Sequence, residues 1–354
     1  MPLKQRLFFY NWTNELSFLA VVLGFIGLHL VGAYLNKRKA TNWMKAQLEG
    51  LKLQFYQVGF DASVNILEPG ALPFSKLLKR LGPVDYVFYA TGRANVSLLH
   101  GKITLVARHN VIMVFLDYVL SFVFGYDAPK DTVEFIVKPS DSEKEKSTYD
   151  GFVFAVVHKD YMKRVREENY DLSLTKTSDH PKLPVSMTVM CESAEIRETF
   201  LTPELIEAVT NAESVFEYLV LSDLPVARPR TVEEFVPSKR GLLSLTMART
   251  ADEHAATSRL VSSFLNTIDV AVAKAHWRSE VMRKLKATRD EEVRKLQKIA
   301  DDEKAEEIAN ARAKEKKEQK KGLAGLSAED QKKASAKERE KEIRRMRGKQ
   351  TRKM

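Results

Sequence analysis

Basic side chains near the end of the chain form the strongest chemical signal in the sequence. Residues 331–354 hold eleven Lys and Arg residues against three acidic ones, which leaves a local net charge of +8 of the chain's +10. The basic residues are Lys332, Lys333, Lys337, Arg339, Lys341, Arg344, Arg345, Arg347, Lys349, Arg352 and Lys353. Such a density of cations attracts phosphate backbones without sequence preference and with a strong dependence on salt.

Three interpretations fit these cations, two of them with a binding target. No aromatic side chains are interleaved for base stacking, so folded RNA matches the segment better than a single strand does. Anionic lipid is a second target, because the same charges suit a membrane surface. A solvated and disordered charged tail is the third interpretation.

Catalytic and metal chemistry has much weaker support. The seven histidines are scattered, and none lies at ligand spacing from a second histidine or from the single cysteine, Cys191. The sequence lacks a P-loop, a G-x-S-x-G and an H-E-x-x-H motif. Residues 90–93 resemble a phosphate-binding turn, but a tight turn with Arg93 solvated or salt-bridged is the simpler interpretation. We therefore expect no enzyme, no cofactor and no metal. An anchored enzyme with a dispersed site in residues 60–240 is an alternative.

The elements that position the basic segment begin with an apolar run, residues 16–35, that carries no formal charge. As a helix it would be roughly 30 Å long, the thickness of a bilayer's hydrocarbon core. It is longer than the apolar region of a cleavable signal peptide and lacks a small-x-small cleavage site after it. We predict one transmembrane helix, anchored by Leu16, Phe18, Val21, Val22, Leu23, Phe25, Ile26, Leu28, Leu30, Val31 and Leu35.

Charges on the two flanks of this segment predict its orientation. Asn36-Lys37-Arg38-Lys39 follows the segment, and Lys45 comes soon after, whereas Lys4 and Arg6 before it are offset by Glu15. The denser cationic flank favours the cytosol. Residues 1–15 would then form a short lumenal arm.

Within the segment, four residues could serve a partner helix. Gly24, Gly27 and Gly32 leave small notches, although they make no GxxxG motif. His29 is the only strongly polar side chain, and it suits either a hydrogen bond to a partner span or polarity tolerated near one end.

Residues 41–250 are predicted to form a cytosolic α+β domain, of one part or two. A helix is expected from Thr41 to Gly59. Strand-like runs occur at Asp85–Tyr89, Ile103–Ala107, Thr132–Lys138, Phe152–His158, Ser186–Met190 and Phe216–Leu221. Helical stretches lie at 110–124, Lys159–Asn169 and Leu201–Asn211, the last with Thr202 as N-cap and Pro203 at the first helical position. The irregular alternation favours α+β over a regular βαβ pattern.

The run Val111–Phe124 needs a separate interpretation. Its fourteen residues with Asp117 in the middle are too short and too polar for a second span. We favour a helix buried in the domain core. The alternative is a helix lying on the membrane or against a partner's span, with Val111, Ile112, Phe115, Leu116, Val119 and Phe122 on the contact face.

The last hundred residues read as charged helices. An apolar stripe from Leu260 to Ala275 indicates a docked helix, and it thins after Trp277 amid dense charge. We predict a long, weakly coiled-coil-like helix over 252–321. Residues 322–326 interrupt it, and a basic helix or tail follows at 327–354, where Ser327 and Asp330 resemble a capping box.

The order of these parts resembles the calumin family, the coiled-coil subunit of the PAT (protein associated with the translocon) complex. The clearest local marks are residues 89–95 (YATGRAN), 132–135 (TVEF), 152–156 (FVFAV) and the charged helix ending in Arg352-Lys353-Met354. The resemblance covers nearly the whole chain after residue 10, and none of its marks is a catalytic signature.

This resemblance implies an endoplasmic reticulum protein that assists multi-spanning membrane proteins. In the family the cytosolic domain sits beneath the protein-conducting channel, and long helices reach ribosomal RNA near the exit tunnel. A small multi-spanning partner, Asterix, supplies much of the intramembrane chaperone surface. Carried over to this chain, residues 337–353 would face rRNA. The animal members' acidic lumenal segment, linked to calcium, has no counterpart in residues 1–15, where Glu15 is the sole acid.

The sequence therefore predicts a non-catalytic scaffold of the translocon that binds translating ribosomes, with the ribosome, the channel, an Asterix-like protein, nascent membrane proteins and the lipid bilayer as partners. An endoplasmic reticulum tether whose basic tail binds anionic lipid is the alternative.

Overall fold

A computed structural model describes residues 10–60, 74–125, 127–140 and 149–324 of the chain. It divides into two compact units. The first holds the chain through Pro229 together with Phe235–Arg289, and the second holds Arg230–Glu234 and the chain from Asp290 onward.

The first unit is built on one antiparallel sheet of ten strands. Their order is β1-β3-β4-β5-β10-β9-β6-β8-β7, and β2 pairs with β3 beside this path. The strands are β1 (Gln57–Val58), β2 (Lys79–Arg80), β3 (Asp85–Thr91), β4 (Val96–Thr104), β5 (Thr132–Pro139), β6 (Val153–His158), β7 (Lys176–Ser178), β8 (Met187–Cys191), β9 (Phe216–Ser222) and β10 (Arg240–Thr246). All the pairings are antiparallel.

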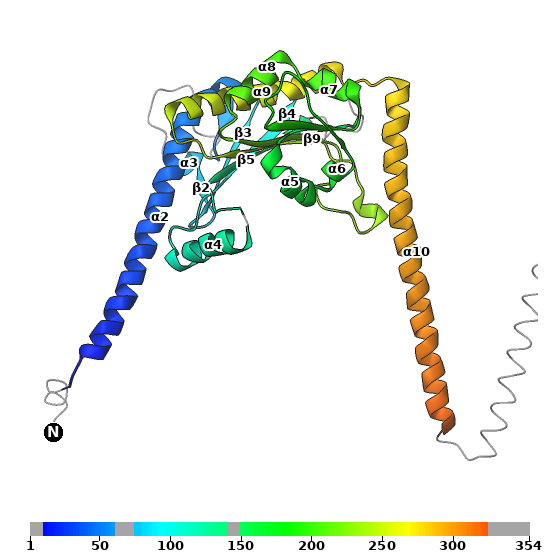
Figure 1. The fold of residues 1–354 in the computed structure, drawn as a ribbon, viewed down its shortest axis with the longest axis horizontal. Helices are drawn as coiled ribbons and strands as arrows, with labels where there is room; N and C mark the ends of the chain where they lie inside the picture. The colour runs from blue at the N-terminus through cyan, green and yellow to red at the C-terminus, as the bar shows by residue number, and fades with distance from the viewer. Residues whose placement is uncertain (1–9, 61–73, 126, 141–148, 325–354) are drawn as a thin grey trace, which may run out of the picture. The chain divides into compact units, whose positions relative to one another are not determined.

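Helices cover both faces of this sheet (Figure 1). The helical elements are α2 (Thr13–Gln54), α3 (Phe74–Leu77), α4 (Val111–Phe124), η2 (Lys159–Tyr161), α5 (Met162–Glu168), α6 (Tyr170–Ser173), α7 (Ala194–Phe200), α8 (Pro203–Asn211), η3 (Val232–Glu234), α9 (Ala251–Lys274) and α10 (Ser279–Ala324). On one face α9 lies with α7, α8 and the C-terminal part of α2, and on the other lie α5 and α6.

The larger hydrophobic core lies between α9, the end of α2 and the sheet. The rings of Trp43, Phe88 and Phe135 meet there, with centroids 5.8–6.1 Å apart. Gly101 on β4 faces the ring of Phe88, and a Cβ at this position would lie 2.0 Å from it, so the core needs a glycine. A smaller core under α5 and α6 includes Val165 and Leu172.

Five of the six strands expected from the sequence agree in position with observed strands, namely β3, β5, β6, β8 and β9. The strand expected at Ile103–Ala107 is the end of the longer β4, which leaves the sheet after Thr104. Strand β10 was not predicted, because its Leu-rich sequence (RGLLSLT) has a single β-branched residue, Thr246, to mark a strand. For α8, the prediction of Thr202 as N-cap is confirmed, since its hydroxyl accepts the Leu205 N–H at 3.2 Å.

Two helix predictions need correction. The span and the helix expected at Thr41–Gly59 form one continuous helix, α2, because no Gly or Pro breaks the helical run between them. The single long helix expected over 252–321 is two helices, α9 and α10, separated at residues 275–278. At this break Asp150 accepts the Trp277 N–H at 2.9 Å and donates its own N–H to the Ala275 carbonyl at 2.9 Å. The described α9 packs into the core, as the stripe from Leu260 predicted.

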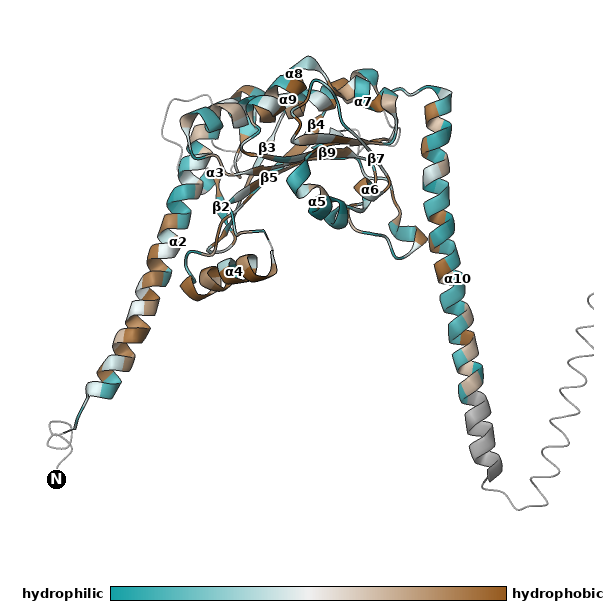
Figure 2. Ribbon diagram, viewed as in Figure 1, coloured by the Kyte–Doolittle hydropathy of each residue, from teal (hydrophilic) through white to brown (hydrophobic). Residues whose placement is uncertain are grey.

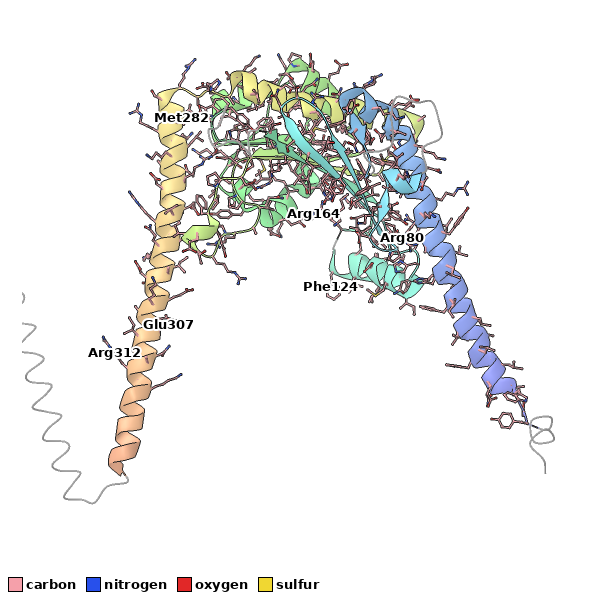
Figure 3. The ribbon with its side chains drawn as sticks, turned by 180° about the vertical axis from the view of Figure 1, so that it is seen from behind. Arg80, Phe124, Arg164, Met282, Glu307 and Arg312 are labelled. Atoms are coloured by element: carbon pink, nitrogen blue, oxygen red, sulfur yellow. The ribbon has the colours of Figure 1, made fainter. Side chains whose placement is uncertain are left out.

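The second unit consists mainly of α10 from Asp290 onward. Its charged side chains, such as Glu307 and Arg312, project from the helix (Figure 3). Lys295 pairs with Glu291 at 3.1 Å and with Glu292 at 2.7 Å, contacts of the kind that support an exposed charged helix. Coiled-coil pairing of this helix stays a prediction.

Candidate membrane interface

Helix α2 has two different surroundings along its length. Among the residues that the structure describes, it is the one helix long and apolar enough to cross a membrane, judged by length and composition. Over residues 16–35 its apolar side chains are almost all exposed, and this part is coloured as hydrophobic in Figure 2. From Ala40 to Leu51 one face of the same helix is buried in the larger core. The helix thus carries an uncovered apolar half directly into the folded unit.

A set of four polar residues joins the end of the apolar half to the sheet, and we refer to Asn36, Lys39, Arg108 and Asp131 as the joint. The Asn36 amide donates to the carbonyls of Pro83 at 3.1 Å and Val106 at 3.0 Å. Its oxygen accepts a bond from Arg108 at 3.1 Å. An amide side chain that pairs three ways fixes its helix both in position and in rotation.

Asp131 is the centre of the joint. Its side chain is 3% exposed, and it accepts two bonds from the Arg108 guanidinium, both 2.8 Å long. It also accepts the Val106 N–H at 2.9 Å and pairs with Lys39 on α2. Burial opposes ionisation of this carboxyl, but the bonds from Arg108, Lys39 and Val106 outweigh it and lower its pKa to about 2. A charged Asp131 therefore ties α2 to the sheet at neutral pH.

Gly32 lies one helical turn before the joint, at a close approach of two backbones. A Cβ at this position would lie 2.1 Å from the carbonyl oxygen of Arg108, so only glycine admits the loop at residues 108–109. His29, one turn earlier, meets the ring of His109 edge-on, with centroids 5.1 Å apart. The notch predicted at Gly32 is thus filled by this chain's own loop. Cβ atoms at Gly24 and Gly27 would meet nothing within 4 Å.

Helix α4 follows this loop and begins at Asn110. The Asn110 side chain caps the helix by accepting the Met113 N–H at 3.2 Å, and Gly125 ends it in the left-handed conformation, at φ 69°. None of its fourteen residues, all of which the structure describes, is buried. Phe122 is 91% exposed.

The prediction that this segment is buried in the core is therefore wrong. Periodicity shows that a segment is apolar and helical, but it does not show what covers the segment. The loop at residues 105–110, which ends at the N-cap Asn110, leads α4 away from the sheet.

Apart from Tyr118, the polar side chains of α4 lie on its more covered side. Asp117 and Ser121 are half-exposed, as are Val114 and Leu120, whereas the other ten residues are exposed. A helix at the surface of a soluble protein has the opposite arrangement, with its polar side outward. In Figure 2 most of α4 is coloured as hydrophobic, like the exposed half of α2.

The break before α10 and the first turns of α10, which both belong to the first unit, are held by aromatic and charged contacts. Trp277 is buried against Phe152 and Phe200, with ring centroids 5.7 and 6.3 Å away. Three turns later, Arg289 bonds to Asp223 at 2.8 Å and to Glu192 at 3.3 Å.

Glu192 is buried in this cluster and also accepts the Val153 N–H at 2.9 Å. Its burial raises its pKa to about 7, against the attraction of Arg289 and with a further contribution from the neighbouring Asp223 carboxylate. One arginine thus serves two buried carboxyl groups, and Glu192 titrates near neutral pH.

Comparisons with known proteins give the family of the chain. The family profile described as "PAT complex subunit CCDC47" matches residues 11–345. This chain belongs to that family.

Two curated relatives are named as UPF0674 endoplasmic reticulum membrane proteins. The one from Schizosaccharomyces pombe is 28% identical over 324 residues, which cover 88% of this chain and 79% of the relative. The one from Saccharomyces cerevisiae is 28% identical over 259 residues, or 67% of this chain and 61% of the relative. The chain thus spans about three fifths of the budding-yeast protein. The resemblance to the PAT complex subunit is confirmed, and the homologues of this chain are endoplasmic reticulum membrane proteins.

In this CCDC47-family chain the predicted site residues have different outcomes. The eleven basic residues from Lys332 to Lys353 and the restart at Ser327 lie outside the described residues, so rRNA binding by them stays a prediction. The eleven anchor residues lie on the apolar half of α2, and the six residues proposed for the contact face lie exposed on α4. The joint was missed by sequence reasoning, although Asn36 directly after the apolar run was a possible signal.

Two residues that were considered for catalysis or metal binding, Arg93 and Cys191, are salt-bridged and buried, respectively. Arg93 pairs with Asp269 at 2.6 Å, so the salt-bridged turn is confirmed. Cys191 is buried on β8, and burial raises the pKa of its thiol. No group of three or more His, Cys, Asp or Glu side chains that could hold a metal occurs in the described ranges. A polar groove over α2, α8 and α9, with Glu204, Ser258 and Arg259 in its lining, is open to solvent.

Proposed function

We propose that this protein is a non-catalytic scaffold subunit of a PAT complex in the endoplasmic reticulum membrane, where it binds translating ribosomes and assists the insertion of multi-spanning proteins. The joint is the observation that carries the proposal. It holds a large folded unit against the end of a candidate span through the buried Asp131, so the unit is presented at the membrane surface in one orientation. A scaffold needs this arrangement, because its function is to hold its partners in a fixed orientation at the membrane.

In this proposal the folded unit lies in the cytosol and the N-terminus lies in the lumen. Lys37 and Arg38 are exposed directly after the apolar half of α2, and Lys79 and Arg80 are exposed on β2. Cations that flank a span on one side favour the cytosolic side of that span.

Ribosome binding is assigned to the charged C-terminal segment. Residues 331–354 carry the cations that suit an rRNA backbone. The first turns of α10, which precede this segment, are attached to the folded unit by Trp277 and Arg289. The ribosome near its exit tunnel, the protein-conducting channel, an Asterix-like protein and nascent membrane proteins would then be partners around a fixed membrane anchor.

Orientation is tested first, in microsomes. A glycosylation sequon is placed in an N-terminal extension well clear of the native Asn11-Trp12-Thr13, and a protease is added outside the vesicles. Glycan addition to the extension together with digestion of the folded unit supports the proposal. An unmodified extension with a protected folded unit contradicts the orientation.

Ribosome binding is tested with the full chain against a chain that ends at Gly322, both solubilised in detergent and sedimented with 80S ribosomes. Two matched controls keep the length: in one the eleven basic residues become Gln, and in the other the order of residues 331–354 is scrambled. Counterion release predicts that the full chain and the scrambled variant co-sediment at low salt and are lost at high salt. The truncated and neutral variants should stay at the top.

RNase treatment and lipid vesicles separate the two targets of the tail. Loss of co-sedimentation after RNase supports rRNA as the target. If the full chain ignores ribosomes at every salt but binds vesicles that contain anionic lipid, the ribosome assignment is wrong and the protein is a membrane tether.

A further inference from the structure

Helix α4 presents an apolar surface that the described chain leaves largely exposed. Ten of its fourteen side chains are exposed, among them Phe115, Phe122 and Phe124. Monomeric soluble proteins rarely leave contiguous apolar patches of this kind uncovered. Something other than water therefore surrounds α4 in the working protein.

The position of α4 along the span gives the depth of this surface. The loop before α4 touches α2 at Gly32 and His29, which precede the last apolar residue, Leu35, by three and six positions. At the rise of an α-helix these contacts lie roughly 4–9 Å inside the end of the apolar segment. Helices that lie in a membrane interface sit roughly 5–10 Å deep, at the boundary of headgroups and acyl chains.

The width of the apolar surface favours lipid over a protein helix as its partner. At about 100° per residue, the ten exposed side chains cover roughly two thirds of the circumference of α4. A helix–helix contact needs a much narrower stripe, whereas acyl chains contact a helix from every open side. The covered remainder carries Asp117 and Ser121, the polar side chains of the helix apart from Tyr118.

Cations lie where lipid headgroups would be. Figure 3 shows Arg80 on the domain side of α4, close to α2, with Phe124 at the far end of the helix. Arg80 and the neighbouring Lys79 are exposed on β2. This order, with apolar helix outermost and basic side chains behind it, matches the layers of a membrane surface.

We propose that α4 lies among the phospholipid acyl chains of the leaflet that the C-terminal end of the span crosses, with Asp117 and Ser121 turned to the protein. The inference rests on the proposed membrane-spanning role of α2. The protein then meets the bilayer at two places, the span and α4, which the joint holds rigidly together. Two points of attachment prevent rotation of the folded unit about the axis of the span.

The test measures lipid contact at single labelled positions in the full-length chain. Cys191 is replaced by Ala, and one cysteine at a time is introduced and labelled with the fluorophore NBD. The positions are Phe122 on the exposed side of α4, Ser121 on its covered side, Phe25 near the middle of the apolar segment, and the 86% exposed Leu53 in the folded unit. The labelled proteins are reconstituted in phosphatidylcholine vesicles whose acyl chains carry bromine at a shallow or a deep carbon.

Bromine close to the headgroups should quench the label at Phe122 at least about twofold more than the label at Leu53, as expected for an interfacial depth. The label at Ser121 should be quenched less than its neighbour, and deep bromine should act best on Phe25. Intrinsic tryptophan fluorescence checks that each variant is folded.

A label at Phe122 that behaves like the one at Leu53 overturns the proposal. So does a Phe122 label whose emission shifts to the blue without any quenching, because a protein surface, such as a second copy of the chain, would then cover α4. Loss of quenching at Phe25 would instead refute the membrane span itself. The failure of the α4 proposal and that of the proposed function are thus distinguishable.

Discussion

At the scale of single residues, a buried carboxylate and a glycine determine how α2 packs against the sheet and the loop before α4. Asp131 receives bonds from Arg108, from the Val106 N–H and from Lys39, which come from the loop before α4 and from α2. Gly32 allows the same loop to approach the helix. Both residues therefore support the contact between α2 and the loop before α4. Asp131 attracts cationic and N–H groups, and Gly32 has no side chain that would clash with the loop.

Replacing Asp131 by Asn should destabilise the first unit by about 2 kcal/mol, less than for a fully buried pair because Arg108 and Lys39 are partly exposed. Because the pKa of Asp131 is lowered to about 2 from an ordinary 3.8, its contribution is present above pH 3.8 and lost as pH falls through 2. Chemical denaturation of the detergent-solubilised chain across pH measures both effects. The exposed Asp127→Asn is the matched control, and equal losses for the two variants would contradict the role of the joint.

Gly32→Leu should displace the loop at residues 108–109 and destabilise the first unit by about 1–3 kcal/mol, the usual cost of overpacking. Gly27→Leu, on the same apolar helix, should have little effect because no atom lies within 4 Å of its Cβ position. The thermal midpoints of the two variants are compared in the same detergent. If both variants melt like the wild type, the close contact between α2 and the loop does not exist.

At the scale of elements, contacts with the sheet determine where helices continue and where they end. Helix α2 enters the core without a break, whereas the run expected as one helix after residue 252 is divided into α9 and α10. The break at residues 275–278 allows Trp277 to pack on Phe152 and Phe200. Arg289 then pairs with two carboxyl groups that come from different strands and loops of the sheet.

The first unit should become less stable as pH rises, because the buried Glu192 carboxyl must ionise. The pKa of Glu192 is raised to about 7 from an ordinary 4.5, mainly by burial. Its contribution to stability is therefore fully present below pH 4.5 and is lost as pH rises through 7, by up to a few kcal/mol. Glu192→Gln should flatten this dependence while Arg289 keeps Asp223 as its partner.

Thermal melts followed by tryptophan fluorescence at pH 5.5 and pH 8 provide the measurement. Glu195→Gln, a more exposed acid three residues further along the chain, is the control and should keep the slope of the wild type. A wild-type midpoint that is the same at both pH values would show that Glu192 stays charged in the folded state.

At the scale of the whole molecule, the described hydrophobic cores and the basic segment lie in different parts of the sequence. The two hydrophobic cores draw on residues between Ala40 and Leu285 in the described chain. The charge that we assign to the ribosome lies in residues 331–354. We therefore expect folding and the proposed ribosome binding to depend on different sets of residues.

A chain that ends at Gly322 should unfold at the same temperature as the full chain, since it keeps every residue of both cores. Differential scanning of the two proteins in one detergent measures the midpoints. A lower midpoint for the shorter chain would show that the basic segment packs on the folded unit. In that case, the full-length variant with the eleven basic residues changed to Gln would be needed to separate an effect on ribosome binding from an effect on folding.

The sequence by itself determined the family of this chain, the apolar segment in residues 16–35 and most of the strands. Each of these is a local property: twenty uncharged residues in a row, or a run of β-branched and aromatic residues, are visible within a short window. Strands β3, β5, β6 and β9 were placed correctly for this reason. Strand β10 was missed because its leucines acquire strand character only between β5 and β9.

Only the tertiary structure decided what surrounds these elements. Lys39 and Asp131 are 92 positions apart, Asn36 and Arg108 are 72 apart, and Arg289 and Glu192 are 97 apart. A buried charge is neutralised by whichever residue the fold brings near, and no window along the chain contains both partners. The exposure of α4 has the same origin: its apolar pattern suits a core and a membrane surface equally, and the loop that joins it to Gly32 settles which side of the domain it faces.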